Sequence, residues 1–490
     1  MSGTATTTSP TTSPGAGAAP ASGRGLRRNY LSFPDVLSQS VGTIAPSGTP
    51  GLVIPVVFAT AANGTWLAYA FATIALLIVA LQINVFASRV STPGSLYVYA
   101  GIGLGPLAGV VSGWSLLIGY VFTAGAVILG TVNTTLAVFH IAGLTSADAF
   151  LAYAIAVIGA AISWWLAYRD IKLSTRTSLI FEFVTVALIV LVVLGYFVTH
   201  GGYAEPQQIH LDGVDLEQLR LGLVLAFFSF VGFESATVLG VEAKSPRVSI
   251  PRGVIWSVIT VGILFVISSL ALVAGFRGVD PGLATADAPL TVLAGSFGAR
   301  PIGILISVGV ALSFLACILA SINAASRVLF SLSHHGIFHQ AAQGTHVRNE
   351  TPHVAVTIVS LVALVLAAGL LIGGWGILDA YGILGSIATY GFLFSYVLVS
   401  IGAPVYLKRQ GLLRLHHVLS AIAAVALLLL VLFGTIYPVP AWPYNVLPYV
   451  FLAFLAVGVG YFLILRATAP AKLAAIEADL LGSEAVQAVE

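Results

Sequence analysis

"FFSFVGFESATVLGVEAKSPRVSIPRG", residues 227–253, places an acidic side chain, Glu234, inside a run that is otherwise apolar enough to lie in lipid. An acidic residue near the centre of a bilayer costs about 2.5 to 3.5 kcal/mol on insertion scales. A residue that costly calls for a compensating role. The stretch therefore predicts a membrane-embedded helix that carries one polar, functional position.

The composition of the whole chain agrees with a membrane location. Of the 490 residues, 58% are hydrophobic and 8% are charged, and the mean hydropathy is +1.02, whereas about a quarter of the residues of soluble proteins are charged. A window of about 19 residues separates apolar segments long enough to cross a bilayer. The sequence thus predicts an all-α integral membrane protein with twelve transmembrane helices, at residues 36–60, 65–87, 104–131, 149–167, 178–198, 219–241, 253–276, 302–325, 354–373, 378–401, 417–436 and 446–465.

A transmembrane β-barrel does not fit these segments. Barrel strands alternate apolar and polar residues over about ten positions, but runs such as "ALIVLVVLGYF" (187–197) do not alternate. Helices are the other structure that satisfies backbone hydrogen bonds in lipid.

The positions of Lys and Arg predict the orientation. All of them except Arg220, Arg277 and Arg300 fall on the side of both termini, and cytoplasmic loops carry an excess of these residues. We therefore expect a multi-pass protein of the plasma membrane with both termini in the cytoplasm. The net charge of +2 is a by-product of this asymmetry and indicates no nucleic acid partner.

The domain organisation follows from the same segments. Residues 1–32 are rich in Ser, Thr, Pro and Gly without an apolar signal region, so they predict a disordered cytoplasmic tail. Residues 33–466 form the twelve-helix domain, and residues 467–490 form a cytoplasmic C-terminal tail. The one cysteine, Cys317, excludes an internal disulfide and is expected to pack as a small hydrophobic residue.

Two apolar segments carry interruptions at matching positions. The first contains "TIAPSGTPG" (43–51) and the sixth contains "SFVGFES" (229–235). Gly and Pro weaken regular helix, and unwound backbone at membrane depth is tolerated where protein or a water-filled cavity satisfies its polar groups. Freed N–H groups at the start of a half-helix favour an anion such as a carboxylate. The alternative is that these residues only kink the helices for packing.

Several stretches resemble the amino acid–polyamine–organocation permeases. The stretch that opens this section is similar to that family's sixth span and the loop after it. "STPGSLYVYAGIGLGPLAGVVSGW" (91–114) resembles the loop after the second span, and "ASINAASRVLFSLSHHGIFHQAAQGTHVRNETPH" (320–353) resembles the end of the eighth. The resemblance implies a leucine-transporter-like core of five plus five helices in inverted repeats, about 33–200 and 217–402, with two additional helices at about 415–466.

The same resemblance implies a set of site residues. The α-carboxylate of a substrate would meet the first break at Ser47, Gly48 and Thr49. The α-amino group would meet backbone carbonyls around Ile44 and around Ser229 to Val231. Phe228 occupies the position where the family often places an aromatic gate over the substrate.

The chain departs from the family pattern at three places. Pro46 stands where a glycine is usual, so one amide is missing from the anion site. The fifth segment has Glu182 where some proton-coupled relatives have lysine. We expect Glu182 either to serve coupling or gating, or to lie near the cytoplasmic end and pair with Arg176 or Arg169.

The third departure is a lack of charge around the expected site. Segments 104–131 and 302–325 contain no charged residue, and 378–401 contains only Asp379 at its predicted outer end. A cationic side chain buried mid-membrane needs an acidic partner, although cation–π contacts also hold cations. The substrate is therefore expected to be neutral.

The two remaining acidic residues have different expected roles. Glu234 either hydrogen-bonds the unwound backbone of the first span or takes up a coupling proton. Glu242 is closer to Lys244 and Arg247 and is expected to belong to a cytoplasmic gate network.

These features predict a permease that moves a neutral amino acid by alternating access, and not an enzyme. Its expected partners are the bilayer, the substrate, and a coupling ion (proton or sodium) or a counter-substrate. A polyamine or other organic amine is the alternative substrate, and a channel or membrane-embedded enzyme fits less well because no filter loop or catalytic cluster is present. We expect no cofactor and no metal site, because the histidines of residues 334–353 lie on a predicted solvated loop.

Overall fold

The computed structural model describes residues 26–144, 148–201, 205–280, 282–286 and 288–468. Within these residues the chain forms helices and turns, and the one extended pairing is a parallel bridge between Leu31 and Ala243. The predicted all-helical class is confirmed. The α-helices are α1 (Phe33–Ile44), α2 (Ile54–Ala61), α3 (Thr65–Ala87), α4 (Leu96–Leu104), α5 (Pro106–Ile141), α6 (Asp148–Arg169), α7 (Ile171–His200), α8 (Pro206–Ile209), α9 (Leu216–Phe228), α10 (Pro246–Gly275), α11 (Pro289–Gly295), α12 (Arg300–His334), α13 (His353–Ile372), α14 (Ile377–Arg409), α15 (Leu415–Gly434) and α16 (Leu447–Thr468).

Two of the apolar segments are not single helices. Among the described residues, ten helical segments are long and apolar enough to cross a membrane, and the first of them, residues 33–87, contains α1, the π-helical turn η1 (Thr49–Val53), α2 and α3. α9 has 13 residues and is followed, after a break, by the 3₁₀ helix η3 (Ser235–Leu239). The chain is thus a multi-pass membrane protein whose first and sixth apolar segments are interrupted.

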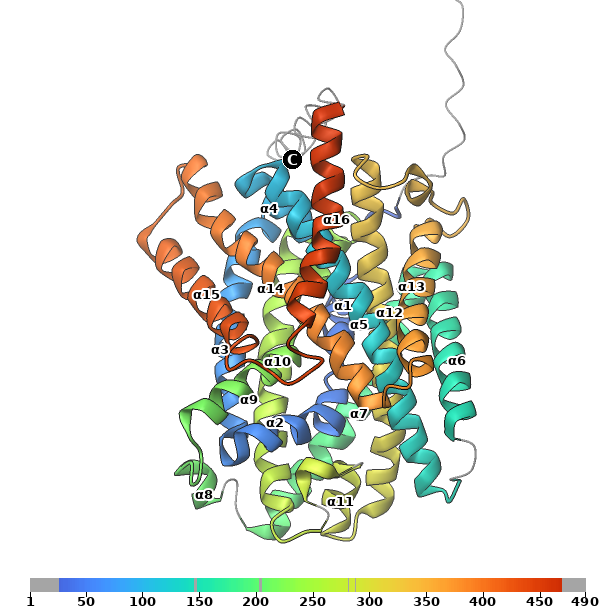
Figure 1. The fold of residues 1–490 in the computed structure, drawn as a ribbon, viewed down its shortest axis with the longest axis vertical. Coiled ribbons are helices and arrows are strands. Elements are labelled where there is room, and N and C mark those ends of the chain that lie inside the picture. Colours follow the sequence, from blue (N-terminus) through green and yellow to red (C-terminus); the bar gives the residue numbers. More distant parts are fainter. Residues whose placement is uncertain (1–25, 145–147, 202–204, 281, 287, 469–490) are drawn as a thin grey trace, which may run out of the picture.

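Burial separates a central group of helices from a peripheral one. The most apolar window of α5 is fully buried and that of α14 is 72% buried, whereas those of α6, α15 and α16 are 28% buried. Figure 1 shows α6 and α13 on one flank, α3 and α15 on the other, and α5, α12 and α14 between them. Peripheral side chains such as Phe150, Phe183 and Val198 are at least 74% exposed. Lipid is the surrounding that suits such a surface.

Hydrogen bonds at the helix starts fix where the chain turns. Asp170 caps α7 because its carboxylate accepts from the backbone N–H groups of Lys172 at 2.7 Å and Leu173 at 3.3 Å. At the start of α1 the Asp35 carboxylate accepts from both the N–H and the hydroxyl of Ser32, at 2.9 and 2.6 Å. These caps hold the α6–α7 corner and the start of α1 on the face that carries the predicted cytoplasmic loops.

The predicted tails fall mostly outside the described residues, which leave out 1–25 and 469–490. The end of the predicted N-terminal tail is nevertheless ordered, because Leu31 pairs with Ala243 and Lys244 N–H donates to the Leu31 carbonyl at 2.9 Å. Composition predicts local disorder but not a bridge to a residue more than 200 positions away.

Candidate functional site

The first break lies between α1 and η1. α1 ends at Ile44 because Ala45 has a left-handed conformation, with φ of 52°, and Pro46 after it has no N–H to donate. Gly48 N–H donates to the Ala45 carbonyl at 2.9 Å, which closes a tight turn before Thr49. The interruption expected in residues 43–51 is present.

The second break lies between α9 and η3. Phe228 is the last residue of α9, and residues 229–234 form turns. Gly232 has φ of 87°, and a Cβ atom there would lie 2.3 Å from Thr43 Cγ2. A glycine is required at this position both by the backbone conformation and by the close approach of α1. The two breaks therefore pack directly against each other.

A small cavity lies between the two breaks, the middle of α5 and α12, and the first turns of α14. Its volume is about 30 Å³, which is room for about one or two water molecules. None of the lining residues is charged. They are Thr43, Ile44, Ala45, Thr49, Val53, Thr123, Val127, Phe228, Ser229, Val231, Phe314, Cys317 and Tyr381.

Three residues that line this cavity have a backbone carbonyl without a hydrogen-bond donor among the described residues. Ile44, Ser229 and Val231 line the cavity, and among the described residues no backbone or side-chain group donates a hydrogen bond to their carbonyl oxygens. Buried carbonyls are normally paired. Three acceptors without partners beside one cavity form an arrangement suited to a ligand that donates several hydrogen bonds, such as an ammonium group.

The structure brings together most of the residues expected at the site. Ile44, Thr49, Phe228, Ser229 and Val231 line the cavity, whereas the other two expected residues do not. The Ser47 hydroxyl donates to the Glu182 carboxylate at 3.1 Å, and the Gly48 N–H is used within its own turn.

Eight lining residues were not expected at the site, and three of them, Thr123, Phe314 and Tyr381, bring a hydroxyl group or an aromatic ring from other helices. Phe314 and Tyr381 lie with ring centroids 6.2 Å apart, and Tyr381 lies 6.0 Å from Phe228, so three aromatic rings form one side of the cavity. Thr123 of α5 adds a hydroxyl group. These residues belong to uniformly apolar helices, where a single aromatic residue or threonine does not by itself indicate a binding site.

Glu182 lies deep in the protein and does not pair with arginine. Its carboxylate accepts from Ser47 Oγ at 3.1 Å and from Ser313 Oγ of α12 at 2.5 Å, and the residue is 2% exposed. Arg176 instead lies 3.7 Å from Asp35. The expected pairing with Arg176 or Arg169 is thus wrong, because residue 182 lies almost two helical turns further into the bundle than residue 176.

Glu234 holds the second break to two other helices. Tyr120 of α5 donates to its Oε1 at 2.7 Å, and Tyr396 of α14 donates to its Oε2. The expectation that Glu234 bonds the unwound first span is wrong, because the neighbouring Ser235 takes that place. The Ser235 hydroxyl donates to the Gln39 carbonyl at 3.0 Å and lies 2.8 Å from the hydroxyl of Thr43.

The model of the amino acid permease family matches residues 35–472. The chain belongs to the amino acid permease family.

Relatives of this permease differ in the substrates that their names state. The branched-chain amino acid permease BcaP of Bacillus subtilis is 27% identical over 367 residues, which cover 72% of this chain and 75% of BcaP. The cationic amino acid transporter 4 of Mus musculus is 23% identical over 364 residues, covering 69% of this chain and 55% of that protein. The low-affinity putrescine importer PlaP of Escherichia coli is 25% identical over 306 residues, covering 61% and 65%.

The permease closes the end of the bundle near Arg327 with a buried ion pair. Arg327 Nε and Nη2 lie 2.5 and 2.9 Å from the two carboxylate oxygens of Glu242, and the two side chains are 1% and 0% exposed. This geometry is bidentate. The sequence placed Glu242 with Lys244 and Arg247 and did not predict its pairing with Arg327, which lies 85 positions away on α12.

The segment before α1 covers this ion pair. Residues 27–31, called the N-terminal strap below, donate the Tyr30 and Leu31 N–H groups to the Glu242 carbonyl, both at 2.8 Å. Arg27 of the strap pairs with Asp170 at 2.9 Å and with Glu350 at 3.3 Å. The strap thereby links the α6–α7 corner, the loop before α13 and the loop after η3.

Proposed function

We propose that this permease is a secondary transporter that moves a neutral amino acid across the plasma membrane by alternating access. The observation that carries the proposal is the uncharged cavity between two broken helices, lined by three residues whose backbone carbonyls have no donor among the described residues. Unwound helix segments facing a cavity at the middle of the bundle are the usual substrate site of transporters built from repeats.

The proposed topology has twelve transmembrane helices. The first span consists of α1, η1 and α2, and the sixth consists of α9, the second break and η3. The remaining spans are α3, α5, α6, α7, α10, α12, α13, α14, α15 and α16. Residues 33–200 and 217–402 then form two inverted repeats with their breaks at matching positions, residues 415–466 add two helices, and both termini face the cytoplasm.

The proposed binding mode places the two ends of an amino acid at the two breaks. The ammonium group donates to the carbonyls of Ile44, Ser229 and Val231. The carboxylate lies at the start of η1, where Thr49 lines the cavity and the amides of Ser47 and Gly48 become available if their turn opens. The N-terminal end of a helical segment favours a negative group.

The side chain of the substrate is proposed to be uncharged. Glu234 already accepts from Tyr120 and Tyr396, and Glu182 accepts from Ser47 and Ser313, so neither carboxylate is among the groups that line the cavity. A cationic side chain would be buried there without a counter-charge, which is costly. The apolar lining, with Val53, Val127 and Phe314, suits an aliphatic side chain.

Glu182 is the group that we propose for coupling to a proton. It is a buried carboxylate without a cationic partner among the described residues, and its hydroxyl partner Ser47 is two residues from Thr49 at the cavity. Asp35 of α1 and Arg300 of α12 lie at the starts of those helices, and Arg327 of α12 is paired with Glu242. A proton on Glu182 would change its bond with Ser47 and so the shape of the first break. Sodium or a counter-substrate is the alternative.

Transport by purified protein in proteoliposomes tests the proposal. We expect saturable uptake of a labelled neutral amino acid, accelerated by unlabelled amino acid inside the vesicles. Competition by other neutral amino acids should be strong, and competition by putrescine or arginine weak. Efficient competition by putrescine would favour the polyamine alternative, and ion conductance without counter-flow would favour a channel.

A further inference from the structure

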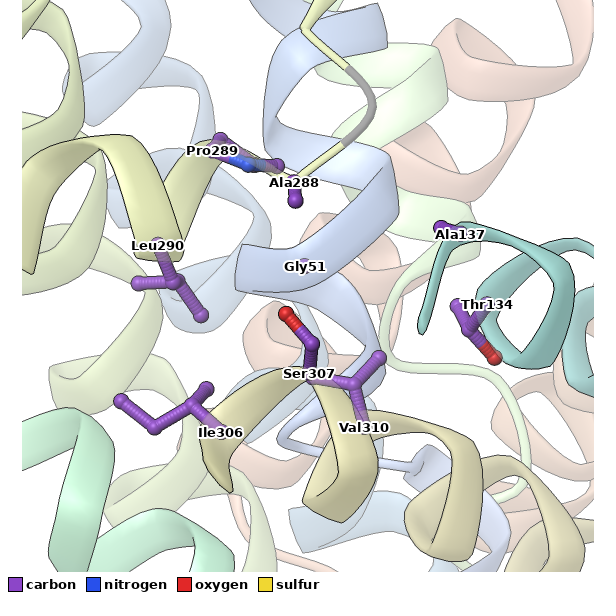
Figure 2. A pocket seen from close by; sticks show the side chains of 9 residues that line it. All are labelled: Gly51, Thr134, Ala137, Ala288, Pro289, Leu290, Ile306, Ser307 and Val310. Carbon is purple, nitrogen blue, oxygen red and sulfur yellow. The ribbon is translucent and has the colours of Figure 1, made fainter. Parts of the chain in front are cut away.

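A second cavity lies beyond the central one along the same three elements. It has a volume of about 20 Å³, and Figure 2 shows its lining, which comes from η1, α5, α12 and the start of α11. On α12 the second cavity is lined by Ser307 and the central one by Cys317, ten residues or roughly 15 Å apart along a helix. The lining residues are Gly51, Thr134, Ala137, Ala288, Pro289, Leu290, Ile306, Ser307 and Val310.

One layer of side chains separates the two cavities. Phe314 and Val310, one turn apart on α12, pack on the first break. A Cβ atom on Gly48 would lie 2.8 Å from Phe314 Cζ, and one on Gly51 would lie 2.8 Å from Val310 Cγ1. A Cβ atom on Gly130 of α5 would lie 3.1 Å from Phe314 Cδ1. The Phe314 ring therefore packs against both the first break and α5, next to a glycine of each.

We propose that Phe314 is the side chain that closes the central cavity towards the second cavity, and that the second cavity is the path by which an amino acid reaches the central one from outside. The ring is held by contacts and not by hydrogen bonds. One of its walls is the break at Gly48, so a movement of the break that accompanies substrate binding changes the width of the slot.

Phe228 has a different place in this arrangement. It lines the central cavity but not the second one. A Cβ atom on Gly385 of α14 would lie 2.5 Å from Phe228 Cζ, so this ring is wedged against α14. Of the three rings at the cavity, Phe314 alone belongs to the layer beside Val310.

The only cysteine of the chain makes the proposal testable without transport. Cys317 lies in the central cavity, three residues after Phe314, and is 1% exposed. The experiment measures the rate at which a membrane-impermeant methanethiosulfonate modifies Cys317 in the full-length protein, in right-side-out and in inside-out vesicles. Cys317→Ser provides the background.

We expect Phe314→Ala to raise the modification rate at least tenfold from outside only, and Phe314→Trp to lower it. Phe330→Ala is the matched control, because Phe330 is on the same helix but stacks on His334 away from both cavities. Ser307→Cys in the Cys317→Ser background should be modified from outside even with Phe314 present.

The proposal is overturned if Phe228→Ala opens Cys317 to the reagent and Phe314→Ala does not, or if Phe314→Ala acts only from the cytoplasmic side. Phe314→Leu, which keeps an apolar side chain of moderate size, separates gating from misfolding, since we expect it to raise the rate while the thermal unfolding midpoint stays near that of the unsubstituted protein. The inference rests on the proposed function for the identity of the substrate. Failure of this inference can be told apart from failure of the proposed function. If the protein transports a neutral amino acid but Phe314→Ala leaves the rate of Cys317 modification unchanged, only the role of Phe314 is refuted.

Discussion

The two ends of the central cavity are closed in different ways. On the side of α11 the closure is one layer of apolar side chains, Phe314 and Val310, packed on glycine. On the side of the N-terminal strap it is a thick polar network, in which Arg327 pairs with Glu242 and the strap bonds the Glu242 carbonyl. Opening the first end displaces rings, whereas opening the second separates buried charges.

This difference has a consequence for the transport cycle. An apolar layer without hydrogen bonds has no polar group that opening would leave unsatisfied, whereas breaking a buried ion pair leaves charges uncompensated until water enters. We therefore expect the resting permease to open more readily towards the α11 side. The predictions below test the polar closure, its coupling to the breaks, and an aromatic ring of the central cavity.

The largest effect is expected for Arg327→Ala. Glu242 would stay buried without a partner, and removing one member of a buried pair costs about 3 to 5 kcal/mol. Thermal unfolding of the purified protein should show a large loss of stability, and uptake should be lost. In the double variant Arg327→Met with Glu242→Leu we expect most of the stability to return. If the single change costs no more than the double one, the pair is not what holds this end closed.

A second effect is expected for Glu182→Gln, which keeps the size of the side chain but removes its titration. If Glu182 carries the coupling proton, a pH gradient should no longer drive accumulation, while counter-flow of the amino acid persists. Accumulation ratios with and without the gradient measure this.

Glu234→Gln is the matched control, because Glu234 is also buried and bonded by two hydroxyl groups. It should keep the dependence on the gradient and lose about 1 to 3 kcal/mol of stability through its weakened bonds to Tyr120 and Tyr396. The reverse result, with the gradient response lost in Glu234→Gln alone, would move the coupling role from the fifth span to the sixth.

The sequence predicted the local features of this site but not its distant contacts. The breaks were predicted because Gly and Pro act on the backbone where they stand, and the resemblance to the permease family implied Ile44, Thr49, Phe228, Ser229 and Val231. The lining residues from other helices, Thr123, Val127, Phe314, Cys317 and Tyr381, have no neighbour in the sequence that marks them.

The partners of the acidic residues were missed for the same reason. Arg327 was recognised as a cytoplasmic charge, but its pairing with Glu242 depends on how α12 packs. Likewise the alternative that placed Glu182 near an end of its helix missed its two serine partners, which come from the first break and from α12. The twelve helices, predicted from hydropathy, and the inverted repeats, implied by the resemblance, stay predictions.

A smaller effect is expected for Phe228→Ala, which tests the ring that lines the central cavity outside the layer of Phe314 and Val310. The ring is partly buried, lies 6.0 Å from Tyr381 and packs on Gly385. Its loss should raise the apparent KM for uptake about tenfold and lower stability by less than the roughly 3 to 5 kcal/mol of a fully buried phenylalanine. Unfolding and uptake are measured on one sample. A large loss of stability with unchanged KM would make Phe228 a packing residue.

The smallest effect on stability is expected for Arg27→Ala in the strap. Arg27 pairs with Asp170 and Glu350 and lies 4.0 Å from the centre of the Tyr30 ring, but its side chain is 39% exposed. Exposed ion pairs contribute about 0.2 to 1 kcal/mol each, so the unfolding midpoint should hardly change.

The same change should nevertheless alter the kinetics of opening at this end. If the strap is released each time the permease opens to the cytoplasm, a loss of about 0.5 to 1 kcal/mol from the closed state raises the rate of efflux from preloaded vesicles roughly two- to fivefold. Arg28→Ala is the control, because Arg28 is the next residue and is exposed. Uptake from outside at saturating substrate should change less than efflux. Equal efflux from the Arg27 and Arg28 variants would mean that the strap stays in place throughout the cycle, and the polar closure would then depend on Arg327 and Glu242 without it.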